Sequence, residues 1–195
     1  MRRAMPILTI LLIGAAGVAV ATNALAAGSA DRSGSDAVLS DAPFAALGGL
    51  RHPAPTGLIE SLDSAYYAER FAPNISAARL VKGTLAGDEQ VWLVPGRGAV
   101  CLFLARGVDK SASCQSNEDA AAGHLIMSIS HRGQAGALVA GVLPNDIVSV
   151  DLVGKSARTV AVDSNVFLAT TDAELASFVD GQGRSQQVTI PLADK

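Results

Sequence analysis

The side chains of this sequence that could act as catalysts are few and lie close together. Ser128-Ile129-Ser130-His131 places hydroxyl groups near an imidazole, and His124 lies a few residues earlier. A serine hydrolase needs a hydroxyl group whose proton passes to an imidazole. Adjacent strand residues point to opposite faces, so Ser130 and His131 do not pair, whereas Ser128 could still act with a distant partner. Ser128, His131 and His124 are therefore the candidates for a hydrolase site, although the sequence has no Gly-x-Ser-x-Gly elbow.

Cys101 and Cys114 are the only cysteines, and they would close a loop of 14 residues. In an exported protein, an even number of cysteines at short spacing predicts a disulfide. Two buried thiols are the alternative. A metal site that adds His124 and His131 is disfavoured, because the close Cys-x2-4-Cys pair typical of zinc sites is missing. A Cys114 nucleophile would need a neighbouring base to ionise its thiol, and the disulfide is the simpler use of this residue.

The remaining motifs argue against several classes of ligand. Gly154-Lys155-Ser156 resembles the end of a phosphate-binding loop, but Ser149 occupies the position of the required first glycine, so we expect an ordinary turn. The net charge is -3, and no cluster of Lys and Arg is longer than Arg2-Arg3, which gives no footprint for nucleic acid. We expect no nucleic acid, no metal and no cofactor.

The N-terminal segment has the three parts of a secretory signal peptide. Arg2 and Arg3 form a basic start, residues 7–21 are apolar, and small residues precede a cleavage site. Ala24 and Ala26 occupy positions -3 and -1 of that site, so the mature chain would begin at Ala27. The sequence therefore predicts export, with residues 1–26 removed.

An uncleaved membrane anchor is the alternative interpretation of the same segment. The uncharged stretch 4–30 has 27 residues, and a membrane-spanning helix needs only about 20. In that case the protein would contact the membrane through residues 4–26 alone. Residues 27–43, rich in Gly, Ser, Asp and Ala, would then form a stalk, whereas after cleavage they form a flexible N-terminal linker.

The rest of the chain divides into a helical lead-in over 44–75 and a β-rich domain over 76–195. Apolar residues recur at helical spacing from Thr56, which predicts one short amphipathic helix that ends near Arg70. After residue 76, short Val-, Leu- and Ile-rich runs end at turn signals. We expect strands over 78–82, 90–95, 99–106, 123–130, 137–143, 147–153, 158–162, 166–169 and 187–191.

This pattern predicts a mainly β fold, an antiparallel β-sandwich or small barrel. The spacing leaves no room for the crossover helices of a parallel sheet. Thr171 and Glu174 are spaced as a capping box, which predicts one short C-terminal helix through about Val179.

The β-rich region resembles a set of small exported proteins of high-GC Gram-positive bacteria. The resemblance covers about 77–187, and it departs from the expected Asp-Gly at Asn145-Asp146. It implies an exported location and a β-rich fold, and it carries no activity. The residues on which it rests are Trp92-Leu93-Val94-Pro95-Gly96, Cys101, Cys114, Gly141-Val142-Leu143-Pro144-Asn145-Asp146-Ile147, Val150 and Asn165-Val166-Phe167.

Three functional hypotheses follow from these patterns. The first is an exported, non-catalytic module that binds a protein or an envelope component through loops such as 107–122 or 131–136. The second is a membrane-tethered sensor or accessory subunit, and the third is a secreted hydrolase. Retention of the anchor would distinguish the tethered sensor from the binding module. A histidine within hydrogen-bond reach of Ser128, Cys114 or a carboxylate in a cleft would distinguish the hydrolase.

Overall fold

The computed structural model describes residues 43–130 and 135–192. The expected signal peptide with Ala24, Ala26 and Ala27, the linker as far as residue 42, and His131 lie outside the described residues. Within the described ranges, none of the helices combines the length and the hydropathy that a membrane span requires.

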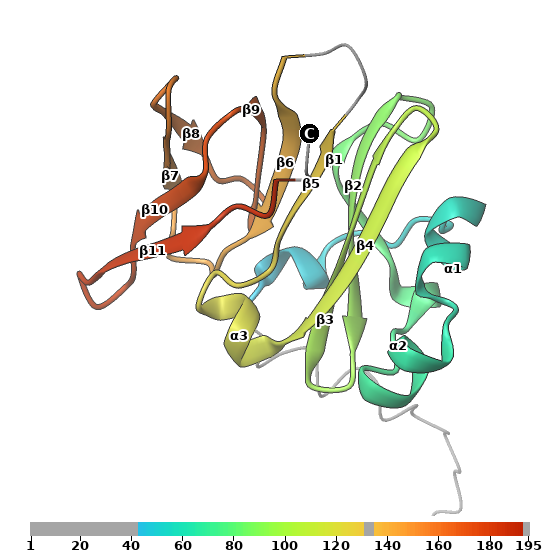
Figure 1. The fold of residues 1–195 in the computed structure, drawn as a ribbon. Coiled ribbons are helices and arrows are strands. Elements are labelled where there is room, and N and C mark those ends of the chain that lie inside the picture. Colours follow the sequence, from blue (N-terminus) through green and yellow to red (C-terminus); the bar gives the residue numbers. More distant parts are fainter. Residues whose placement is uncertain (1–42, 131–134, 193–195) are drawn as a thin grey trace, which may run out of the picture. The chain divides into compact units, whose positions relative to one another are not determined.

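The described residues fold into three antiparallel sheets, as the sequence predicted for a mainly β protein (Figure 1). The first sheet has the order β1 (Arg79–Gly83), β2 (Glu89–Gly96), β3 (Ala99–Arg106) and β4 (Asp109–Ser116). The middle sheet has the order β5 (Ile126–Ser130), β6 (Ala137–Val142) and β9 (Val166–Thr171). The last sheet has the order β11 (Ser185–Thr189), β10 (Leu175–Val179), β7 (Ser149–Val153) and β8 (Arg158–Ala161). Within the described ranges the strands do not close into a barrel, and the three sheets share two apolar cores.

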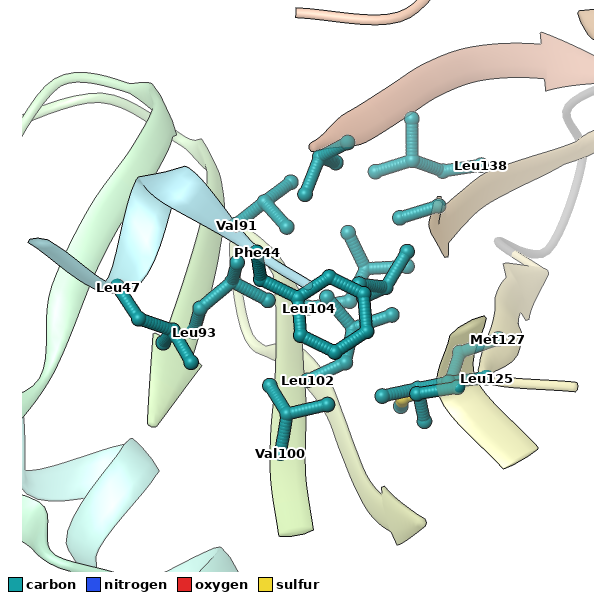
Figure 2. Packing of buried hydrophobic residues seen from close by; sticks show 14 of the residues in the cluster. Phe44, Leu47, Val91, Leu93, Val100, Leu102, Leu104, Leu125, Met127 and Leu138 are labelled. Carbon is teal, nitrogen blue, oxygen red and sulfur yellow. The ribbon is translucent and has the colours of Figure 1, made fainter. Parts of the chain in front are cut away.

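The middle sheet is covered by apolar side chains on both faces. Every residue of β6 is buried. Leu138, Ala140 and Val142 pack in a core shared with the first sheet, which Figure 2 shows from close by. Ala137 and Val139 face the other way, into a second core shared with the last sheet. Because successive strand residues alternate between faces, a strand buried on both sides needs an uninterrupted apolar run, which β6 has.

Two short helices cover the outer face of the first sheet. These are α1 (Thr56–Leu62) and α2 (Ala65–Arg70), where the sequence predicted one continuous helix. The helix breaks because the Ser64 hydroxyl accepts the N–H of Tyr67 at 3.3 Å and so begins α2 anew. Two 3-10 helices, η1 (Ala45–Gly48) and η2 (Ile75–Ala77), complete the lead-in.

The predicted C-terminal helix is wrong. Its residues form the end of β9 and the whole of β10. The Thr171 hydroxyl does accept a backbone N–H, but from Ala173 at 3.0 Å, within a turn and not at a helix start. Ala176 and Phe178 then alternate into the core of the last sheet, and pairing with β7 and β11 outweighs the local capping signal.

The expected loop 107–122 is also largely ordered as secondary structure. It contains β4 and the short helix α3 (Asn117–Ala121). Gly154-Lys155-Ser156, in contrast, is the turn between β7 and β8 that the sequence predicted.

The predicted disulfide between Cys101 and Cys114 is confirmed. The two residues lie directly opposite each other on β3 and β4, with Cα atoms 4.0 Å apart. The Asn117 N–H donates to the Gly98 carbonyl in the same ladder, so the alternation of an antiparallel pair makes Cys101 and Cys114 a non-hydrogen-bonded pair. Such pairs bring side chains closest together. The disulfide indicates an oxidising, extracytoplasmic environment.

Candidate functional site

The catalytic candidates do not meet within the described residues. Ser128 lies in β5, and its hydroxyl donates a hydrogen bond to the Pro191 carbonyl. His124 precedes β5, and its Nδ1 lies 3.9 Å from Asp119 Oδ1, with both side chains more than half exposed. Cys114 is held in the disulfide. Over 43–130 and 135–192, no three His, Cys, Asp or Glu side chains gather as metal ligands would.

His124 nevertheless lies on the wall of a groove. The groove separates the start of β5 from β11, two strands of different sheets that adjoin in Figure 1. Its volume of about 520 Å³ lies within the range of small-ligand sites. The residues that line it are Gly123, His124, Ile126, Gln187, Val188, Thr189 and Pro191.

The first wall of the groove is fixed by the turn from α3 into β5. The Ser116 hydroxyl caps α3 by accepting the Asp119 N–H at 3.0 Å, and the His124 N–H donates to the Asp119 carbonyl at 2.9 Å. Gly123 has a φ of +83°, and a Cβ there would lie 2.7 Å from the ring of Phe178. A glycine at this turn therefore lets β5 approach the last sheet closely.

The two faces of β5 have different neighbours. Leu125, Met127 and Ile129 pack into the core shared with the first sheet. Ile126 and Ser128 consequently face the last sheet and the C-terminal end of the described chain.

The second wall is positioned by the tight turn between β10 and β11. Both carboxylate oxygens of Asp180 accept hydrogen bonds, from the backbone N–H groups of Gln182 and Arg184 and from the side chains of Arg184 and Gln186. The Arg184 backbone N–H, followed by the Gln186 side chain, lowers the pKa of Asp180 from 3.8 to about 2. Hydrogen bonds to the charged form have this effect.

We expect the contribution of Asp180 to stability to disappear in acid. Its pKa is depressed in the folded protein, so the stabilisation is complete above the ordinary pKa of 3.8 and is lost as the pH falls toward 2. Urea denaturation of the wild-type protein and Asp180→Asn at pH 6, 4, 3 and 2 should show a difference in unfolding free energy that shrinks toward pH 2. A difference that stays constant over this range would contradict the assignment.

A second recess, of about 380 Å³, surrounds Asn145 and Asn165, which belong to the resemblance but received no role from the sequence. Their side-chain oxygens accept backbone N–H groups of the lead-in: Asn145 from Ala45 at 2.7 Å and Asn165 from Ala46 at 2.9 Å. Asn165 is 7% exposed, and its amide also donates to Asn145 at 2.9 Å. The pair therefore holds the start of the described chain against the sheets, which is a structural role. The sequence feature that could have pointed to this turn is the asparagine at position 165. Asn165 has a φ of +62°, and asparagine adopts positive φ values more readily than most residues.

The groove thus combines accessible polar groups with a ligand-sized volume. Among the sequence-predicted candidates, His124 lines the groove, and so does Pro191, the hydrogen-bond partner of Ser128. His124 and Ser128 themselves do not form a hydrogen-bonded pair. Comparison of the chain with protein-family models, curated proteins and solved structures gave no match.

Proposed function

We propose that this protein is an exported, non-catalytic binding domain of the cell envelope or exterior, and that its ligand occupies the groove between β5 and β11. The observation that carries the proposal is the groove itself, open to solvent and large enough for a ligand. The nucleophilic groups that the sequence offered have other roles: the Ser128 hydroxyl donates to Pro191, and Cys114 is half of the disulfide. Recognition, not bond cleavage, is the function that this arrangement favours.

The location rests on two independent features of the chain. The disulfide is stable where the surroundings are oxidising. The basic, apolar and small-residue segments that precede Ala27 have the order of a secretory signal peptide. Export through this signal also fits the resemblance to small exported proteins of high-GC Gram-positive bacteria.

Two measurements test the proposal. Expression of the full chain in a bacterium competent for secretion should yield a soluble extracytoplasmic product whose N-terminal sequence starts at Ala27. A product that keeps Met1 and remains in the membrane fraction would favour the tethered sensor instead.

A photo-cross-linking residue at His124 should form adducts with envelope components in intact cells, whereas one at Val108, which is 90% exposed, should not. Equal labelling from both positions would contradict a binding site in the groove.

A further inference from the structure

The outer edge of β5 carries unpaired backbone groups. The Val142 N–H donates to the Leu125 carbonyl at 2.9 Å, so these two residues form a hydrogen-bonded pair of the antiparallel ladder. Hydrogen-bonded and non-hydrogen-bonded pairs alternate in such a ladder. The N–H and C=O groups of Ile126, Ser128 and Ser130 therefore point away from β6, toward the open edge.

The outer edge of β11 has the same property. Backbone hydrogen bonds from Asp180 to Arg184 and from Ile190 to Glu174 mark the hydrogen-bonded pairs at the two ends of the β10–β11 ladder. By the same alternation, the backbone groups that point away from β10 belong to Ser185, Gln187 and Thr189. No described segment forms a backbone hydrogen bond with either outer edge.

These two open edges border the same groove. Ile126 lines it from β5, and Gln187 and Thr189 line it from β11. The strands are linked at one end by the hydrogen bond from Ser128 to Pro191, and the groove continues from there toward His124. An unpaired strand edge is a template for another strand, and an extended peptide that adds to such an edge gains main-chain hydrogen bonds.

We propose that the groove binds an extended peptide segment of a partner protein, which adds as a strand to the open edge of β11. This inference rests on the proposed binding function and names the class of its ligand. Backbone groups of Gln187 and Thr189 would pair with the peptide. The described lining contains no Asp, Glu, Lys or Arg, and it offers the apolar surfaces of Ile126 and Pro191, so the recognised segment is uncharged and carries apolar side chains.

A proline at position 187 tests the proposal, because it removes an outward N–H and leaves the β10–β11 ladder intact. The probe is a displayed library of random ten-residue peptides, selected on the purified, disulfide-bonded protein. We expect uncharged, apolar peptides to be enriched, and Gln187→Pro to weaken their binding about tenfold or more through loss of a main-chain hydrogen bond.

The matched control is Ala161→Pro on β8. The Val162 N–H donates to the Val148 carbonyl, so Ala161 also points its N–H outward, at the opposite edge of the same sheet. This variant should bind the selected peptides as the wild-type protein does. Circular dichroism and thermal melting establish that both variants are folded.

Amide hydrogen exchange of the wild-type protein gives a readout that does not depend on the folding of any variant. Bound peptide should slow exchange at Gln187 and Thr189 and leave Ala161 unchanged. The proposal is overturned if no peptide is enriched, if Gln187→Pro binds normally, or if these amides stay unprotected. It is also overturned if the edge mediates a dimer of this chain that Gln187→Pro abolishes. Peptide binding is measured on purified protein, so its failure is distinguishable from a failure of export.

Discussion

Replacing Phe44 by alanine is expected to lower the free energy of unfolding by about 3–5 kcal/mol, the range for large aromatic side chains removed from a core. Phe44 is 1% exposed and lies just before η1, in the core between the first and middle sheets. Figure 2 shows its ring among side chains of the core that the two sheets share. The ring fills space between two layers that are themselves fixed by strand pairing, so the cavity left by alanine has little means of collapse.

Leu50→Ala is the matched control for this prediction. Leu50 lies six residues further along the chain and is 83% exposed, so its truncation should change stability by about 0.5 kcal/mol or less. Urea denaturation monitored by circular dichroism and by the fluorescence of Trp92 measures both variants. If Phe44→Ala were as stable as Leu50→Ala, the lead-in would not be part of the core, and the hydrogen bonds from Ala45 and Ala46 to the two asparagines would have to be reinterpreted.

Strands that are continuous apolar runs were predictable from the sequence, whereas β4 was not. β3 and β6 are continuous apolar runs that end at turns, and both were expected. β4 has the sequence Asp-Lys-Ser-Ala-Ser-Cys-Gln-Ser, with no large aliphatic residue, and it was missed. It is a strand because β3 offers it a complete ladder and the disulfide joins the pair. The stability of β4 is thus supplied by its partner, which no local pattern reveals.

The candidate site was predictable only in part, because its walls come from distant parts of the chain. His124 and Ser128 were identified by their chemistry. The groove, however, depends on the approach of β5 to β11, and Ser128 and Pro191 are 63 residues apart. The direction in which the backbone groups of each strand point depends on register, and register is set by the pairing with β6 and β10. A single sequence identifies which residues can form a strand and does not show which edge stays open.

Removing the disulfide with Cys101→Ala and Cys114→Ala together is expected to lower the free energy of unfolding by about 3 kcal/mol, the value for a closed loop of about 15 residues in the chain-entropy model. For a protein of this size, that change corresponds to a fall in Tm of roughly 6–12 °C. Both cysteines are buried, so alanine adds a smaller loss of packing. Thermal melts of the wild-type protein with and without dithiothreitol, and of the double variant, measure the effect.

Leu85→Ala is the control variant, because Leu85 is 56% exposed in the turn between β1 and β2. It should melt as the wild-type protein does. If the reduced protein melted within about 1 °C of the oxidised protein, the disulfide would contribute little, and the fold would not depend on an oxidising compartment.

Loss of the disulfide should also affect the groove. β4 leads directly through α3 into β5, so loosening of β4 would disturb the wall that carries His124. Peptide binding should therefore weaken in dithiothreitol before the protein as a whole unfolds, which would link the proposed binding function to an oxidising environment.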